Sequence, residues 1–482
     1  MKSLVTRVLQ ALSPSPSQER PASDATSPAC PTEIRRNLPT GNPSFSSMTE
    51  IHAAMLTCPD IATLQVRTVG SGCSEWPDRF NFPFDLRGGE RYASAPLVLS
   101  LDGYDFDESE WRTLCGPLFD DWDLTYLSWM SWRRLWQCAR LYYEVPEVQR
   151  LRTNLDLWVD AMDFSRIHTL QLNYTRGRSS LTEQVVQKLP SRLTSLTTLA
   201  VHHSMAQGFI LSLPKGSLTH LSWQNPTRDY RSCGDSHGSP FITLEPVLQH
   251  QGWPLQSLEY HSEEWDTHAP PTLSVLELGQ LTKLAPGLRT LTINLPRQLS
   301  ASGGETWDWP WESLRLLAEG LPQLTDLTIY FELASECHRQ SAKKNNSWVE
   351  YDGGDGSRPL EDEDGCVGLD HYAQPLLNKT NAVPLARFLA HHKSGQRLRS
   401  VMFRAGDWGP DYDGPLRFGA PWLEGRRAWV MCRWGDPAIA GSEDGAGSGD
   451  VVCEGGTGGL YSWEEDAEWM EYGGYGYELG WQ

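Results

Sequence analysis

The stretch Leu196-Thr-Thr-Leu199-Ala-Val201 decides the fold, because it sets a phrase of two leucines and a third apolar residue that the chain repeats. The phrase returns as Leu218-Thr-His-Leu221-Ser-Trp223, Leu255-Gln-Ser-Leu258-Glu-Tyr260, Leu288-Arg-Thr-Leu291-Thr-Ile293 and Leu324-Thr-Asp-Leu327-Thr-Ile329. A phrase of this form that recurs about every 20 to 40 residues is typical of a leucine-rich solenoid, in which each repeat adds one strand to a shared parallel sheet. The sequence therefore predicts an α/β fold, an irregular leucine-rich-repeat solenoid with helices outside the sheet.

The same phrase extends the predicted array in both directions. It occurs earlier at Ile61–Val66, Pro96–Leu101 and Ile167–Leu172, and later at Leu398–Phe403. Helix signals lie between the phrases. Asp308 is a candidate cap with Pro310 in the first turn and Gly320 at the end, Asn381 and Pro384 open another helix, and Ser47-Met-Thr-Glu50 reads as a capping box. The predicted solenoid spans residues 48–433.

Four segments depart from the repeat. Residues 1–47 form a Pro/Ser-rich leader and 332–381 an acidic loop, and their low apolar content predicts disorder. Residues 111–164 are longer than one repeat and predict a helical insertion. Residues 434–482 predict a disordered acidic tail rich in Gly, Trp and Tyr. Acids alternating with aromatics are typical of segments that fold on a partner, with a solubilising role as the alternative.

Composition limits the classes of function and the compartment. The net charge of -20 argues against nucleic acid or anionic membrane as partner, since phosphates reward Lys and Arg. The ten cysteines include no C-x-x-C pair, so we expect reduced thiols and a cytoplasmic or nuclear protein. A mitochondrial transit helix over residues 1–12 is the alternative. No apolar run approaches the roughly 18 residues that a membrane span needs.

Side-chain alternation identifies a candidate binding surface. Within each strand the second and third apolar residues of the phrase point inward, so the residues that flank them point onto the shared concave face. The predicted partner-binding residues are Arg67, Gln171, Asn173, His202, His220, Gln224, Glu259, His261, Asn294, Asp326, Tyr330 and Arg404. Such a mixed polar surface with a few aromatic residues suits protein recognition. The alternative is that these are solvated strand residues.

Signals for an enzyme are weak. The segment His261–His268 holds nitrogen and oxygen donors but lacks the helical i, i+4 spacing of a zinc site, and Asp352–Asp364 lacks the spacing of a calcium loop. The tryptophans at 129, 132 and 136 have the spacing of a core stripe. We therefore expect no catalytic residues, no metal and no cofactor, with a carbohydrate-active or metal-dependent enzyme as the alternative.

Several stretches resemble filamentous-fungal proteins of the F-box-like leucine-rich-repeat family. They are Ile51-His-Ala-Ala-Met55, Gly72-Cys-Ser-Glu-Trp-Pro-Asp-Arg-Phe-Asn-Phe-Pro-Phe-Asp85, Gly103-Tyr-Asp-Phe106 with Glu110-Trp111, Thr153-Asn-Leu-Asp-Leu-Trp158 running to Ile167-His-Thr-Leu170, and Glu424-Gly-Arg-Arg-Ala-Trp429. The resemblance covers about residues 48 to 433.

The resemblance implies a role in recruiting substrates to a cullin-type ubiquitin ligase, because family members that keep an F-box dock it on a Skp-type adaptor. This chain departs from the family at that point. Its one Leu-Pro candidate, Leu38-Pro39, is followed by Thr-Gly-Asn-Pro43, which breaks a helix. We therefore predict a protein–protein interaction module, with substrate recognition for a ligase and a free-standing scaffold as its two roles.

Overall fold

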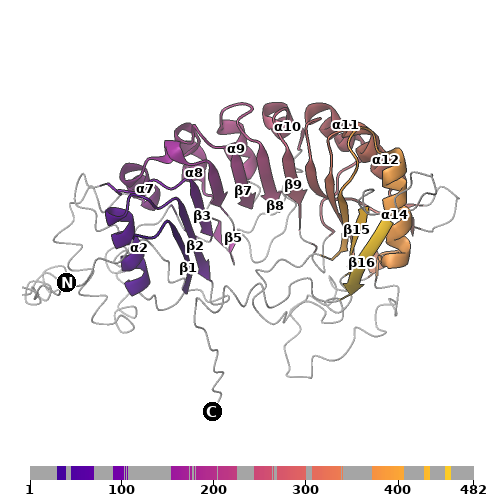
Figure 1. Ribbon diagram of the computed structural model, residues 1–482, viewed down its shortest axis with the longest axis horizontal. Helices are drawn as coiled ribbons and strands as arrows, with labels where there is room; N and C mark the ends of the chain where they lie inside the picture. Colours follow the sequence, from indigo (N-terminus) through magenta and orange to yellow (C-terminus); the bar gives the residue numbers. More distant parts are fainter. Residues whose placement is uncertain are drawn as a thin grey trace, which may run out of the picture. The chain divides into compact units, whose positions relative to one another are not determined.

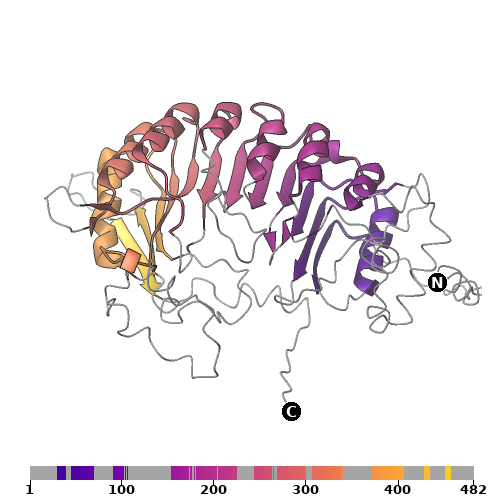
Figure 2. The same ribbon diagram turned by 180° about the vertical axis from the view of Figure 1, so that it is seen from behind.

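The structure is a computed structural model, and it describes residues 30–39, 45–69, 91–102, 104, 106, 153–172, 174–175, 178–179, 181–202, 205–224, 244–262, 264, 269–299, 307–337, 339, 372–406, 428–434 and 451–457. The chain divides into two compact units, Met1–Ser195 and Leu196–Gln482. Each unit is α/β, with helices along one side of a sheet that is parallel in the first unit and mostly parallel in the second (Figures 1 and 2).

The first unit contains a parallel sheet of four strands in chain order. They are β1 (Glu33–Pro39), β2 (Thr63–Val69), β3 (Val98–Asp102) and β4 (Thr169–Leu172). Its helices are α2 (Phe45–Thr57), α7 (Asn154–Ala161), η1 (Phe164–Arg166), α8 (Glu183–Lys188) and η2 (Pro190–Arg192), and β5 (Tyr174–Thr175) pairs with β6 (Arg178–Ser179). Thr153 and Asp156 close a capping box at the start of α7, which satisfies backbone N–H groups that a helix start leaves free.

The second unit alternates strands and helices along most of its length. Its strands lie in the order β7 (Thr198–His202), β8 (His220–Gln224), β9 (Ser257–His261), β10 (Thr290–Asn294), β13 (Asp326–Phe331), β14 (Ser400–Ala405), β15 (Ala428–Trp434) and β16 (Val451–Thr457). The helices are α9 (Ala206–Ser212), α10 (Glu245–Gln251), α11 (Val275–Leu284), α12 (Trp311–Gly320) and α14 (Lys379–His392). A short pair, β11 (Gln298–Leu299) and β12 (Trp307–Asp308), lies apart from this sheet, in which β15 and β16 are antiparallel.

The repeated phrase accounts for the core of the second unit. The second leucine of each phrase occupies one row across neighbouring strands, and every member is at most 2% exposed: Leu199, Leu221, Leu258, Leu291, Leu327 and Val401. Helix residues such as Leu314 and Leu317 of α12 are buried as well. Every strand that the phrase predicts is therefore present at its predicted place, which confirms the strand assignments and the α/β class.

The structure differs from the predicted boundaries at several points. Strand β1 lies inside the leader expected to be disordered, and β16 lies inside the expected disordered tail. Leu333, Ala334 and Tyr372 are buried and Ala334 bridges to Tyr372, although all three fall in the expected acidic loop. The central parts of that loop and of the helical insertion, 340–371 and 107–152, lie outside the described residues.

Helix starts also shift from the prediction. Helix α2 begins at Phe45, so Ser47 lies inside it and cannot cap it. Pro310, and not Asp308, occupies the cap position of α12. Asn378 caps α14 by accepting from the backbone N–H of Asn381, so this helix begins two residues before Asn381. Of these three helices, α14 has a capping side chain, whereas α12 begins at Pro310 without a side-chain cap hydrogen bond.

Two disulfides correct the expectation of reduced thiols. Cys30 bonds to Cys58 in the first unit, and Cys432 bonds to Cys453 across β15 and β16 in the second. The second bond is possible because the antiparallel register pairs these two residues directly, with their Cα atoms 4.1 Å apart. The spacing of the cysteines in the sequence does not predict that register.

Candidate functional site

Polar side chains of the second unit share the face of the sheet that is turned away from the helices, which we call the polar face. The strand register places them in three rows. The row nearest the strand starts is Thr198, His220, Ser257, Thr290, Asp326 and Ser400; the middle row is Ala200, Ser222, Glu259, Thr292, Thr328 and Met402; the third row includes His202, Gln224, His261, Asn294, Tyr330 and Arg404. Alternation along each strand therefore brings together nine of the twelve predicted residues, with Glu259 at their centre.

Glu259 accepts hydrogen bonds from both neighbouring polar side chains of β8. Ser222 Oγ donates at 2.5 Å to one carboxylate oxygen and Gln224 Nε2 donates at 3.0 Å to the other. His261 Nδ1 lies 3.2 Å from the same carboxylate. Burial raises the pKa of Glu259, but the hydrogen bonds from His261, Ser222 and Gln224 outweigh it and lower the pKa from 4.5 to about 2. Glu259 is therefore a fixed negative charge on the polar face.

The rings of His261 and Tyr330 form the other half of the cluster. They stack with centroids 4.7 Å apart and planes 14° apart, and both are more than nine-tenths buried. Arg404 Nη1 donates to the Tyr330 hydroxyl at 2.6 Å, and its guanidinium carbon lies 5.3 Å from the centre of that ring. Glu259, His261, Tyr330 and Arg404 thus form one chain of contacts over β9, β13 and β14.

The remaining predicted residues fall into three groups. Asn294 is buried and bonds both backbone groups of Ser262, so it holds a turn and is not available to a partner. Asp326 is engaged by two nitrogens of Arg399. His202 is buried on β7 and His220 is exposed on β8.

In the first unit, Gln171 lies half-buried on β4. The Arg67 side chain and Asn173 lie outside the described residues, so their predicted roles are not tested.

A buried charged cluster, which the sequence did not reveal, lies beyond the carboxyl ends of β9 and β13. Glu264 is 3% exposed and accepts from the backbone N–H groups of Leu333 and Ala334 at 2.7 and 2.8 Å. Arg339 Nη2 donates to Glu264 at 2.6 Å, and Arg339 Nη1 donates to Glu332 at 3.2 Å. These contacts fix the chain that follows β13. Glu264 is separated from Arg339 by 75 residues, so the pairing has no local sequence signal.

Arg297 lies against two neighbouring aromatic rings beside this cluster. Its guanidinium carbon is 4.1 Å from the ring centre of Trp309 and 4.8 Å from that of Phe331, and Nη2 donates to the Glu332 carbonyl. Burial lowers its pKa to about 9, although Glu332 and Glu264 act in the opposite direction. Cation–π contacts thus replace part of the hydration that this arginine loses.

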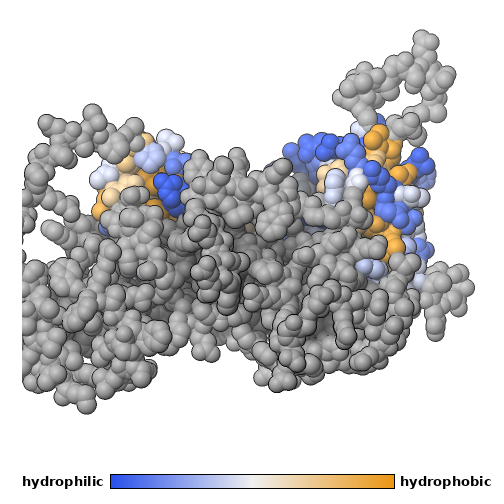
Figure 3. Space-filling model, turned by 90° about the horizontal axis from the view of Figure 1, so that it is seen from below, coloured by the Kyte–Doolittle hydropathy of each residue, from blue (hydrophilic) through white to orange (hydrophobic). Residues whose placement is uncertain are grey.

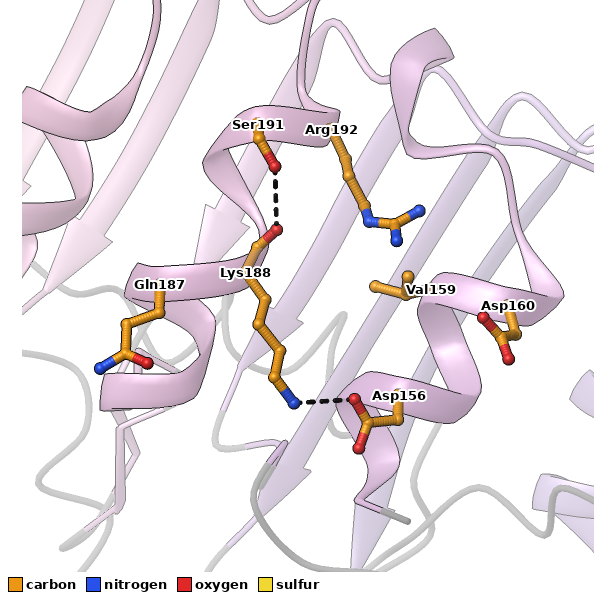
Figure 4. Close-up of a pocket in the computed structure, with 7 residues that line it drawn as sticks. All are labelled: Asp156, Val159, Asp160, Gln187, Lys188, Ser191 and Arg192. Atoms are coloured by element: carbon orange, nitrogen blue, oxygen red, sulfur yellow. Dashed lines mark hydrogen bonds and ion pairs between the residues drawn. The ribbon is translucent and has the colours of Figure 1, made fainter. Parts of the chain in front are cut away.

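A second polar site is a surface pocket of the first unit, between α7 and the α8–η2 segment (Figure 4). Lys188 Nζ bonds to Asp156 at 2.8 Å across the pocket, and Arg192 points into it beside Val159. The other lining residues are Asp160, Gln187 and Ser191. Two bases, Lys188 and Arg192, and two acids, Asp156 and Asp160, line the pocket, so its charges are balanced and it does not favour an ionic ligand of either sign.

The metal-site alternative at His261–His268 is not supported where it is described, because His261 contacts Glu259 while Glu264 contacts Arg339. Among the described residues, no group of three or more His, Cys, Asp or Glu side chains is placed to hold a metal ion. At the end of the second unit that carries α14 and β16, hydrophobic and hydrophilic residues are interspersed on the surface (Figure 3). A partner that binds at this end would therefore meet both polar and apolar side chains.

Comparison with known proteins returned no match to a family model, a curated protein or a solved structure. The fold therefore defines a class only, an open α/β arrangement with a mostly parallel sheet. Within the described residues, no helix is long and apolar enough to cross a membrane.

Proposed function

We propose that the chain is a leucine-rich-repeat protein that binds a protein partner on the polar face of its second unit. The observation that carries the proposal is the contact chain Glu259–His261–Tyr330–Arg404 on β9, β13 and β14. In it two buried rings hold a half-buried guanidinium and a half-buried, fixed carboxylate in place on the polar face. Such groups dominate the energetics of protein interfaces, where Tyr and Arg are enriched among the residues that matter most.

Preorganisation supports the same proposal. Each side chain of the contact chain is held by a neighbour: Glu259 by Ser222 and Gln224, and Tyr330 by Arg404. Binding then costs less side-chain entropy, which for a free long side chain is about 0.5–1.5 kcal/mol. Leucine-rich solenoids present such strand surfaces to their partners as a continuous array.

Within this function, the family resemblance favours substrate recruitment to a cullin-type ubiquitin ligase. A free-standing scaffold is the second candidate, and the Cys30–Cys58 and Cys432–Cys453 disulfides favour it. Disulfides persist in oxidising compartments and are rare in the cytosol and nucleus, where such ligases work.

A crosslinking experiment in the protein's own cells tests the binding function. We would compare the partners captured by the wild type, by a polar-face variant with Tyr330→Phe and Arg404→Ala, and by a control with Arg315→Ala and Arg387→Ala on exposed positions of α12 and α14. Proteins captured by wild type and control but lost from the polar-face variant are the expected result. Identical capture by all three would refute binding on the polar face.

The proteins captured in this experiment also distinguish ligase recruitment from a free-standing scaffold. A Skp-type adaptor among the captured proteins supports ligase recruitment. Alkylation of free thiols before purification, followed by mass spectrometry, shows whether Cys432 and Cys453 are bonded in the cell. Bonded cysteines without an adaptor support the scaffold.

A further inference from the structure

The amino ends of the parallel strands in the second unit form a regular edge. One backbone N–H at each strand start donates to the carbonyl of the equivalent residue one strand back: Gln256 to Thr219, Arg289 to Gln256, Thr325 to Arg289 and Arg399 to Thr325, at 2.7–2.9 Å. The turns that lead from each helix into the next strand therefore lie side by side along this edge, which we call the amino edge (the upper ends of these strands in Figure 1).

Basic side chains gather on the amino edge. Lys215, Arg289 and Arg397 are exposed in the turns or at the first strand positions, Lys283 is exposed in the last turn of α11, and Arg433 is exposed on β15 opposite Ser400. The Arg399 side chain is 80% exposed. Lys393 lies there too, with its ammonium bonded to the Leu321 and Pro322 carbonyls. The described acids of this edge are Asp326 and Glu319, so seven bases face two acids in a chain of net charge -20.

The two acids are already engaged by neighbours. Asp326 accepts from Arg399, Ser400 and Thr325, and Glu319 lies 3.1 Å from His392. Charges near helix ends explain a part of the pattern, because a cation in the last turn complements the helix dipole, as Lys283 does. That effect does not account for Lys215, Arg289, Arg397 and Arg433, which lie in turns and strands outside any helix.

An exposed tryptophan lies within the same edge. Trp253 is 79% exposed, in the turn between α10 and β9. Its turn is next to that of Lys215, since Gly216 N–H donates to the His250 carbonyl and a Cβ at Gly216 would lie 3.8 Å from the Pro254 side chain. On the other side, the Trp253 carbonyl lies near Gly287, two residues before Arg289. A large exposed aromatic ring flanked by cations is typical of an interaction surface.

We propose that the amino edge binds an extended acidic segment of a partner protein that carries an aromatic side chain. From β8 to β15 the edge crosses five strand spacings of about 4.8 Å, or about 24 Å in all. An extended chain advances about 3.3 Å per residue, so a segment of about seven residues spans the edge. Its carboxylates pair with Lys215, Arg289, Arg397 and Arg433, and its aromatic ring packs on Trp253.

The short length of the positive stretch favours a peptide over a nucleic acid. Salt screens charges beyond about 8 Å at physiological ionic strength. An anionic ligand at the amino edge is therefore attracted by the cations of the edge and is little affected by the net charge of the whole chain. The positive stretch is short, however, and a polynucleotide would continue past it over a chain of net charge -20. The amino edge adjoins the polar face, with which it shares Asp326, but the inference does not rest on the function proposed above.

The test uses the full chain and a fluorescein-labelled peptide of about eight residues, with alternating glutamates and one central tryptophan. The edge variant combines Lys215→Glu, Arg289→Glu and Arg397→Glu. The matched control combines Arg315→Glu, Lys379→Glu and Arg387→Glu, which are exposed in the same unit away from the edge and change the net charge equally. Circular dichroism checks folding, and the milder variants Arg289→Gln and Arg397→Gln serve if a triple variant unfolds.

Fluorescence anisotropy is expected to show binding to the wild type and control, with Kd at least about tenfold higher for the edge variant and about two- to threefold higher for each single glutamine variant. Trp253→Ala should raise Kd for the tryptophan peptide and leave Kd for its alanine analogue unchanged. Equal losses in both triple variants, or no binding by the wild type, would overturn the proposal. Tighter, edge-dependent binding of a single-stranded oligonucleotide of similar length would overturn it in favour of nucleic acid.

Discussion

Replacing Arg339 by methionine should destabilise the second unit more than any change of a surface charge. Arg339 donates at 2.6 Å to Glu264, and both side chains are 3% exposed. Methionine keeps the volume of the aliphatic stem but leaves the carboxylate with the N–H groups of Leu333 and Ala334 as its remaining described partners. Breaking a buried pair by removing one partner costs about 3–5 kcal/mol, since it leaves a buried charge uncompensated.

The penalty should depend on pH in a defined direction. Burial, which outweighs Arg339 and the two backbone N–H groups, raises the pKa of Glu264 from 4.5 to about 7. Arg339 lowers this pKa, so its removal raises the pKa further. A carboxyl whose folded pKa exceeds its unfolded value binds more protons when folded, so its contribution to stability is present below about pH 4.5 and is lost as pH rises through the folded pKa. The difference in the free energy of unfolding between wild type and Arg339→Met should therefore be larger at about pH 8 than at about pH 6.

Urea unfolding of wild type, Arg339→Met and the exposed control Arg315→Met measures this directly. The control should change the free energy of unfolding by less than about 0.5 kcal/mol, because Arg315 is exposed on α12. Adding Glu264→Gln to Arg339→Met should recover a part of the loss, since the buried charge is then removed. A loss below about 1 kcal/mol, or one that is independent of pH, would refute the assignment of Glu264 as a buried carboxylate that depends on Arg339.

Three further predictions concern stability and use the same unfolding assay. Gly395→Ala should destabilise the protein by more than about 1 kcal/mol, because Gly395 has φ +70° and a Cβ there would lie 2.5 Å from the Pro322 carbonyl oxygen. As a control, Gly279→Ala in α11 should stabilise it by about 0.5–1 kcal/mol, because a Cβ there meets nothing within 4 Å. Asn294→Ala should cost about 1–3 kcal/mol, because Ser262 N–H and C=O lose their bonds to a buried side chain; a near-neutral result would show that water replaces it. Cys453→Ser should cost about 3 kcal/mol, because the Cys432–Cys453 bond closes 21 residues, and an equal midpoint for wild type with and without reductant would contradict this.

Repetition explains why most strands were predictable. A strand of a stacked array must bury its second and third apolar residues against the same neighbours each time, so Leu221, Leu258 and Leu291 are equivalent by position. Alternation then places the residues between them on the polar face. For the contact chain at Glu259, alternation predicted that its members share one face of the sheet, but it did not predict the hydrogen bonds among them.

Elements at the ends of the array were not predictable by the same argument. Strand β1 pairs with β2 but has charged residues at Glu33, Arg35 and Arg36 and lacks the phrase. Strands β15 and β16 are antiparallel and lack the phrase, and a faint alternation of Ala428, Val430 and Cys432 is their signal. Pairings over long sequence separations, such as Glu264 with Arg339, depend on where the stacked turns end and have no local pattern.

The disulfides bear on which of the two roles is correct. A ligase subunit works where thiols are kept reduced, and in that setting Cys432 and Cys453 would stay unbonded and β16 would depend on its backbone pairing with β15 and on α14. Gly455 permits the close approach of β16 to β15, since a Cβ there would clash with the Trp429 carbonyl oxygen. A strand with two consecutive glycines has little intrinsic preference for its extended form and benefits from a covalent bond to its neighbour. The proposed scaffold role therefore predicts that Cys432 and Cys453 are bonded in the cell, whereas the proposed ligase role predicts that they are free thiols.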